Sequence, residues 1–382
     1  MPRTGVADLP LHPGKAPRWL FSRMTQLAQG IVDVILLEYD ENLLLRRLAD
    51  PFWFQAFSCV LGFDWHSSGT TTVTCGALKM ALDPERHGIT AVGGKGKASK
   101  KAPEEIIKGC EIFGITPTKS EELVYSSRMS AKVDSTAIQD SYQLYHHVLI
   151  FTERGDWCVV QQGMNPENRY ARRYHWLSEQ VDSFVCEPHF AIVGEREKHR
   201  TLDMTSGASK ESQRISVDLV KESPKKLKGM VDSLRKPGQS SLSDWGLEIG
   251  GGWQNSQVSL FMPTRINWNM MKMAYEFQPK DYEELISIKG VGPKTVRALA
   301  LVSELVYGEP PSWRDPVKYS FAVGGKDGVP YPVDKKAMDE SIEIIKRGIA
   351  EAKVGKNEKL RAMKRLREFV PPDIKLENYW AY

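Results

Sequence analysis

Residue types suited to proton transfer or metal binding are gathered in two stretches of the chain. Asp64 and His66 lie in one stretch, and His147 and Gln162 lie in the other. Such side chains can move protons near neutral pH or hold a divalent cation, Mg²⁺ or Mn²⁺, that activates water. No HExxH spacing is present, so the pattern does not identify a metal. We expect these four residues to be the catalytic set of a hydrolytic reaction. The alternative for any one histidine is a buried, hydrogen-bonded core position.

A glycine-flanked pair of lysines offers a second chemistry. Lys95 and Lys97 alternate with glycines within 92–101, where glycine lets ammonium and backbone groups approach a phosphate closely. One of these lysines, with its pKa lowered by desolvation and neighbouring cations, could instead form a Schiff base with an abasic-site aldehyde. No Ser or Thr directly follows either lysine as in a Walker A loop, so ATP binding is not predicted.

The most specific pattern in the chain covers 281–299. Gly290 and Gly292 flank one apolar residue, Val291, and Pro293 suits the first turn of a following helix. This spacing predicts two short helices joined by a tight turn. The amides that begin the second helix are then free to face an anion.

Charged and polar residues beside this turn point to the same ligand. Lys289, Lys294 and Thr295 surround the predicted helix start. The segment resembles the helix-hairpin-helix motif of DNA repair and replication proteins, although Val296 stands where many of them carry alanine. The resemblance implies contacts to DNA phosphates without reading of bases. A plain helix–turn–helix connection is the alternative. The residues expected to bind DNA are Lys289, Gly290, Val291, Gly292, Lys294, Thr295, Arg172 and Arg173.

Positive charge is clustered although the whole chain is nearly balanced. There are 52 Lys and Arg against 48 Asp and Glu, a net charge of +4, which argues against indiscriminate coating of nucleic acid. The basic clusters lie at 95–101, at 169–173 and at 341–370. A solvated helix face explains the last cluster equally well. Hydrophobic residues make up 41% of the chain, which excludes fibrous and wholly disordered classes.

Two aromatic-rich runs, 142–151 and 157–163, predict a β-hairpin whose loop is 153–156. Pairing Thr152 with Trp157 places His147 opposite Gln162. One face is then expected to carry Gln143, Tyr145, His147 and Gln162, and the other Tyr142, His146 and Gln161. With a third strand at 184–193 and the segment 169–176, this predicts the wall of a polar pocket.

The remaining patterns place these residues on a two-part fold. Apolar periodicity and turn signals predict helices at 17–39, 52–61, 70–82, from Pro103 onward and at 120–138. We expect an α+β fold, with a helical N-terminal part packed on a small antiparallel sheet and a mainly helical C-terminal part. The expected units are a mixed domain at 1–198, a basic connector at 199–242 and a helical domain with the glycine turn at 243–382.

Segments spread over nearly the whole chain carry a further resemblance. Those at 50–57, 63–69, 93–97, 144–147, 159–164 and 171–176 are similar to a conserved family of unknown function, found in archaea and some bacteria, many of them thermophilic. The resemblance implies only that the polar segments form one unit ending in the helix-hairpin-helix.

From these residues we expect a cytoplasmic DNA-processing enzyme, a repair-type nuclease acting on damaged or branched DNA. A Schiff-base abasic-site lyase and a non-catalytic, structure-specific DNA-binding protein are the open alternatives. The five cysteines are scattered without a CxxC pair, so neither a disulfide framework nor a zinc knuckle is indicated. The apolar stretch 20–39 contains polar residues at regular intervals, which predicts an amphipathic helix.

Overall fold

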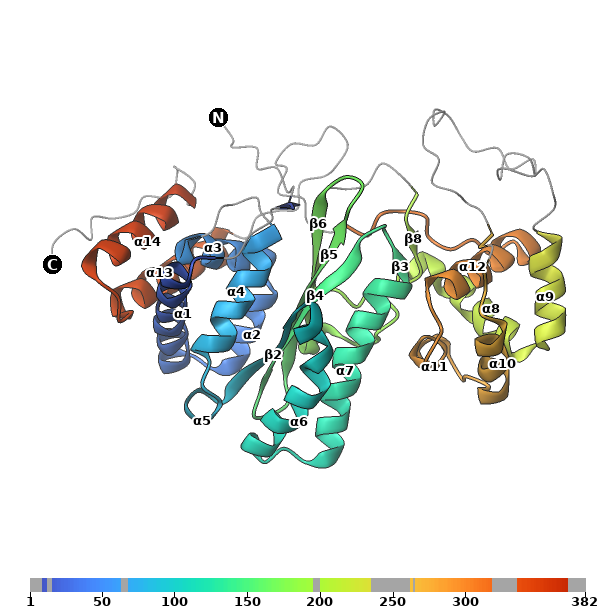
Figure 1. Ribbon diagram of the computed structural model, residues 1–382, viewed down its shortest axis with the longest axis horizontal. Coiled ribbons are helices and arrows are strands. Elements are labelled where there is room, and N and C mark those ends of the chain that lie inside the picture. The colour runs from blue at the N-terminus through green and yellow to red at the C-terminus, as the bar shows by residue number, and fades with distance from the viewer. Residues whose placement is uncertain are drawn as a thin grey trace.

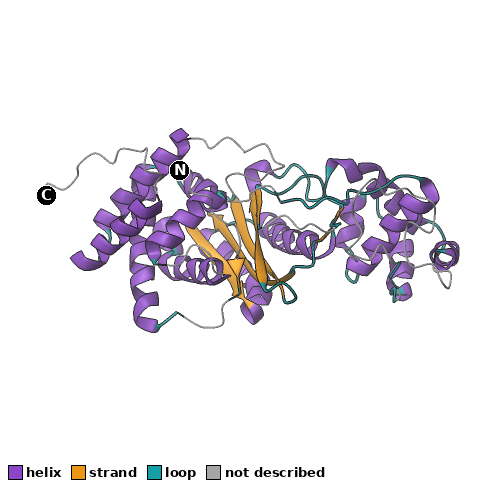
Figure 2. Cartoon of the chain, turned by 90° about the horizontal axis from the view of Figure 1, so that it is seen from above, coloured by secondary structure: helices purple, strands orange, loops and turns teal. Residues whose placement is uncertain are grey.

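A central antiparallel sheet stands between two groups of helices in the computed structural model (Figure 1). The structure describes residues 9–11, 16–62, 68–194, 200–234, 262–263, 265–317 and 335–369. Seen from above, helices flank the strands on both sides, and a further helical lobe extends away from the sheet (Figure 2). The predicted α+β class is confirmed.

Among the described residues, six strands form the main sheet. Its order is β1 (Leu9–Pro10), β6 (Tyr170–Leu177), β5 (Trp157–Asn165), β4 (Gln143–Thr152) and β2 (Ile89–Lys95), with β7 (Ala191–Val193) also pairing with β6. A separate pair joins β3 (Ile138–Gln139) to β8 (Leu202–Asp203).

The glycine-rich segment predicted as a loop is partly a strand. β2 pairs with β4 as far as Lys95, and the 3₁₀ turn Gly96–Lys101 follows it. Glycine is required within this strand, because a Cβ at Gly93, whose φ is +90°, would lie 2.3 Å from the His147 carbonyl oxygen. Glycine therefore serves close backbone approach here and not only a flexible loop.

The predicted hairpin is confirmed, but its register is wrong by one residue. Trp157 pairs with Phe151, because the Thr152 amide donates to the Asp156 carbonyl and so belongs to the turn. Consequently His147 lies opposite Gln161 and not opposite Gln162.

An extra residue in β4 changes the face assignments further. A bulge lies between Leu144 and His146, so Tyr145 lies on the same side as Gln162, which donates a hydrogen bond to its hydroxyl. The third strand of the sheet is β6 rather than 184–193, of which only the three residues of β7 are extended.

The first four long helices cover one face of the sheet. They are α1 (Arg18–Glu38), α2 (Glu41–Ala49), α3 (Pro51–Leu61) and α4 (Ser68–Ala81), followed by the short α5 (Pro84–His87). Asp50 caps α3 by accepting from the Phe52 amide at 2.8 Å, and Gly62 ends the helix with φ +118°. These sequence signals placed α1, α3 and α4 with only small shifts at their ends.

The C-terminal helices pack back on this N-terminal group. α13 (Lys335–Glu351) contacts α1, and α14 (Lys356–Phe369) contacts α3. Small residues let the backbones approach, since a Cβ at Gly30 would lie 2.5 Å from the Cα of Ala352. Among the described helices α1 alone is long and apolar enough to cross a membrane, but its apolar residues pack in this core.

The other sheet face is covered by α6 (Ala102–Phe113) and α7 (Pro117–Thr136). Beyond them lies a lobe formed by α8 (Lys210–Lys221), α9 (Pro224–Ser233), α10 (Trp268–Phe277), α11 (Tyr282–Ser287) and α12 (Pro293–Tyr307). The interval 199–242, predicted as a connector, therefore supplies two packed helices of this lobe. The predicted helical domain at 243–382 is divided, because α13 and α14 pack on α1 and α3 rather than on α12.

Candidate functional site

The turn between α11 and α12 has a fixed shape set by capping and by core packing. Asp281 caps α11 by accepting from the Glu284 amide at 2.8 Å. Gly290 has φ +98°, a conformation that favours glycine. The Val291 side chain is 1% exposed and packs in the core of the lobe, which anchors the turn from inside. Gly292 is the N-cap of α12 and has no side chain to occupy the helix start.

Basic side chains surround this helix start at the surface. Lys289 and Lys294 are exposed on either side of the turn. Lys132 of α7, which the sequence did not single out, donates from Nζ to the Ile288 carbonyl at 3.4 Å. Its burial lowers the pKa of the Lys132 ammonium. The predicted contacts by Val291 and Thr295 are corrected, since the Thr295 side chain is only 3% exposed.

A polar row crosses the sheet on the face covered by α4. The directly paired residues Lys95, His146, Gln162 and Arg173 come from β2, β4, β5 and β6 and therefore share one face. Gln162 donates to the Ser68 carbonyl at 2.9 Å, in the first turn of α4. Four segments that carried the family resemblance are thus neighbouring strands.

Arg173 is a buried cation whose contacts are to neutral groups. Its guanidinium donates to His175 Nε2 at 2.9 Å, to Gln55 Oε1 at 3.3 Å and to Thr71 Oγ1 at 3.4 Å. It also lies 4.6 Å from the centroid of the Phe54 ring. Burial lowers the pKa of Arg173 to about 10.

His146 lies next to Gln162 in this row. Its side chain is 1% exposed, and within the described structure neither ring nitrogen has a hydrogen-bond partner. Burial, with the nearby His147 and Lys95, lowers the pKa of His146 to about 3. The imidazole is therefore neutral at physiological pH.

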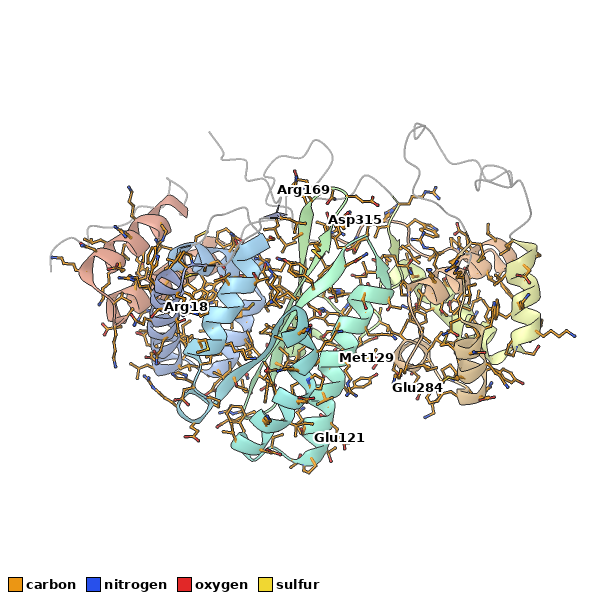
Figure 3. The ribbon with its side chains drawn as sticks, viewed as in Figure 1. Arg18, Glu121, Met129, Arg169, Glu284 and Asp315 are labelled. Carbon is orange, nitrogen blue, oxygen red and sulfur yellow. The ribbon has the colours of Figure 1, made fainter. Side chains whose placement is uncertain are left out.

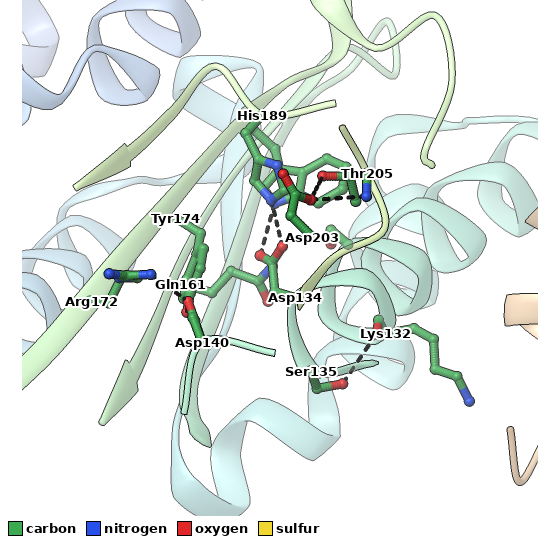
Figure 4. A network of polar contacts seen from close by, with 12 residues as sticks. Lys132, Asp134, Ser135, Asp140, Gln161, Arg172, Tyr174, His189, Asp203 and Thr205 are labelled. Atoms are coloured by element: carbon green, nitrogen blue, oxygen red, sulfur yellow. Dashed lines mark hydrogen bonds and ion pairs between the residues drawn. The ribbon is translucent and has the colours of Figure 1, made fainter. Parts of the chain in front are cut away.

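The opposite face of the sheet carries a fully connected polar network (Figure 4). Asp134 of α7 accepts hydrogen bonds from Gln161 at 2.5 Å, from Trp176 at 3.0 Å and from His189 at 2.5 Å. His147 Nδ1 lies 2.8 Å from Gln161 Oε1, and its Nε2 lies 2.8 Å from the Ser127 hydroxyl. Because the amide oxygen can only accept, Nδ1 carries the proton and Nε2 accepts from Ser127. Burial lowers the pKa of His147.

Arg172, on the same face, is matched by two carboxylates. It donates to Asp140 at 2.9 Å and to Asp315 at 2.7 Å, and Tyr174 also donates to Asp140 at 2.6 Å. Burial alone would lower the pKa of Arg172, but the two carboxylates raise it above its usual value. Burial raises the pKa of Asp140.

The prediction that Arg172 and Arg173 bind DNA is wrong for this structure, because both side chains are 0% exposed. Arg169 is the exposed member of that basic cluster. It lies at the end of the sheet near Asp315 (Figure 3).

The structure does not bring the predicted catalytic residues together. Asp64 and His66 lie outside the described residues, and His147 and Gln162 point to opposite faces of the sheet. Lys95 and Lys97 are exposed at the end of β2, where Lys95 Nζ lies 5.7 Å from the centroid of the Tyr145 ring. Within the part of the chain that is described, no three His, Cys, Asp or Glu residues are grouped to hold a metal.

Asp134, Asp140, Asp315 and His189 were missed by the sequence reasoning. Each lies outside the motifs, and Asp315 is 143 residues from its partner Arg172. The only available signal was that an arginine flanked by strand residues needs an acidic partner when it is buried.

Fold and site together define an α+β protein with polar layers on both faces of an antiparallel sheet and an exposed basic helix–turn–helix. The chain belongs to the family described as protein of unknown function (DUF763), which matches residues 5–333. No curated protein and no solved structure matches it.

Proposed function

We propose that this protein binds the phosphate backbone of DNA through the turn between α11 and α12. The observation that carries the proposal is the exposed start of α12, where Gly290 and Gly292 leave the backbone accessible between Lys289 and Lys294. Helix amides and the positive end of the helix dipole favour an anion at such a position. The resemblance to the helix-hairpin-helix motif supports DNA as the source of the phosphate.

The surroundings of the turn support a contact that positions DNA without reading its sequence. Lys132 adds a third ammonium group close to the Ile288 carbonyl at the base of the turn. None of these groups has the planar bidentate geometry that discriminates between bases. Binding should therefore depend on salt and be insensitive to base sequence.

Fluorescence anisotropy with duplexes of different sequence tests the proposal. Replacing both Lys289 and Lys294 with alanine should weaken binding to every duplex about equally. It should also reduce the slope of log affinity against log salt by about two. The matched control replaces Lys210 and Lys225, exposed on α8 and α9 of the same lobe, with alanine. Unchanged affinity and slope in the Lys289/Lys294 variant would refute the proposal, as would a loss confined to one sequence.

We also propose a chemical step on the bound DNA, in one of two forms. A lyase would use Lys95, which is exposed at the end of β2 beside Lys97, to attack an abasic-site aldehyde with release of water. A nuclease would use Asp64 and His66, which directly precede α4 in the chain, with a divalent cation. The exposure of Lys95 favours the lyase among the described residues.

Abasic, flap and nicked duplexes distinguish these forms. Cleavage that EDTA abolishes supports the nuclease. A borohydride-trapped adduct that disappears in Lys95→Gln supports the lyase. Binding without product would leave a non-catalytic, structure-specific DNA-binding protein.

A further inference from the structure

A cleft of about 360 Å³ opens directly beside the first residue of α12. Pro293 and Arg297 of α12 line one side, and the end of β5 with its turn to β6 lines the other. Because Pro293 lies between Gly292 and Lys294, the cleft begins at the turn that we propose to hold a phosphate. Its volume is within the range of small-molecule sites.

Side-chain hydrogen bonds connect the floor of this cleft to the start of α12. Gln139 donates from Nε2 to the Pro293 carbonyl at 2.8 Å, and Arg297 donates from Nε to Gln139 Oε1 at 2.8 Å. On the opposite wall, Asn168 of the β5–β6 turn donates to the Tyr142 hydroxyl at 3.2 Å. The two walls are therefore held by contacts independent of any ligand.

The lining suits a neutral, flat, polar group better than a second phosphate. Gln143 and Asn165 offer amide donors and acceptors of the kind that pair with base edges, and Gln143 is exposed. Pro166 and Pro293 add apolar surface from opposite walls. The exposed Glu167 at the rim would repel a phosphate.

We propose that this cleft receives one unpaired or everted nucleotide of the DNA strand whose phosphate lies at the start of α12. The inference rests on the proposed DNA binding and deepens it, because it identifies DNA with an unpaired nucleotide as the preferred ligand. The phosphate turn supplies affinity for any DNA, and the cleft adds affinity only when a base is free to leave the duplex.

Two 20-mer duplexes test the inference, one perfectly paired and one with a single bulged 2-aminopurine. The full chain should bind the bulged duplex roughly tenfold more tightly, and the 2-aminopurine emission should change on binding. Gln143→Trp fills the cleft from an exposed position at the start of β4. It should remove this preference while leaving affinity for the perfect duplex unchanged. Gln180→Trp, an exposed glutamine at the other end of the sheet, is the matched control.

The outcomes separate the two proposals. Equal binding of both duplexes by the wild-type chain would overturn the cleft while leaving the phosphate turn intact. A preference that survives Gln143→Trp would overturn it as well. Failure to bind either duplex would overturn the proposed function and the cleft together, and Lys294→Ala should weaken both duplexes by the same factor if the turn binds phosphate.

Discussion

Arg172 and Arg173 are neighbours on β6 and both are fully buried, yet the two faces of the sheet surround them differently. Arg172 faces α7 and is paired with Asp140 and Asp315, which raise its pKa. Arg173 faces α4 and has only neutral hydrogen-bond partners, so burial lowers its pKa.

This contrast shows that the two polar layers have different roles. On the α7 face, charges are matched and hydrogen bonds are complete, so the network joins the sheet to the start of β4 and to the segment after α12. The α4 face contains a cation without a carboxylate among its described contacts, and a histidine with two unsatisfied nitrogens. Stability therefore depends more on the first layer than on the second.

The largest expected effect is from Arg172→Met. This change leaves Asp140 and Asp315 buried without their cation, so the free energy of unfolding should fall by about 3–5 kcal/mol. Urea denaturation followed by circular dichroism measures the loss. Arg169→Met, at an exposed arginine on the same strand turn, is the control and should have almost no effect. Comparable stability of the two variants would contradict the assignment of Arg172 as a charge-matched anchor.

A smaller loss is expected from Arg173→Met. Removing this cation leaves no buried carboxylate unpaired and exposes only neutral acceptors such as Gln55, so the cost should be about 1–2 kcal/mol. The same urea titration provides the comparison. If Arg173→Met were as damaging as Arg172→Met, the two faces would not differ in the way described.

The smallest effect at neutral pH, and the most specific, concerns His146→Phe. The wild-type imidazole has a pKa of about 3 in the folded chain and an ordinary value of 6.5 when unfolded, so unfolding takes up a proton below pH 6.5. Stability from this group is complete above pH 6.5 and is lost as the pH falls towards 3. His146→Phe should flatten this loss by about 1.4 kcal/mol per pH unit. At pH 7.5 it should be close to neutral.

His147→Phe provides the matched comparison on the α7 face. It removes the partner of Ser127 and of Gln161, so it should destabilise the chain at pH 7.5 by about 1–3 kcal/mol. Equal stability of the His146 and His147 variants at this pH would show that the orphaned and the hydrogen-bonded histidine do not differ energetically.

Elements with a local signal were predictable from the sequence. Asp50, Pro51 and Gly62 mark both ends of α3, and the two aromatic runs predicted the β4–β5 hairpin. The glycine turn between α11 and α12 was predicted in the same way, from residues whose backbone requirements are known.

The register and the site assignments lacked such a local signal. A bulge at Tyr145 adds one residue without altering the hydrophobic pattern, which moved His147 and Gln162 onto opposite faces. β2 was taken for a loop because its glycines are typical of loops, whereas one of them is needed for contact with β4.

The sequence by itself determined where helices begin and end, where the chain turns, and which backbone positions must be glycine, because these depend on neighbouring residues. The tertiary structure alone decided which buried charge is matched. Adjacent residues of a strand point to opposite faces, and the partner of Arg172 comes from 143 positions away. Two identical side chains next to each other in the sequence thus acquired different environments through contacts that only folding creates.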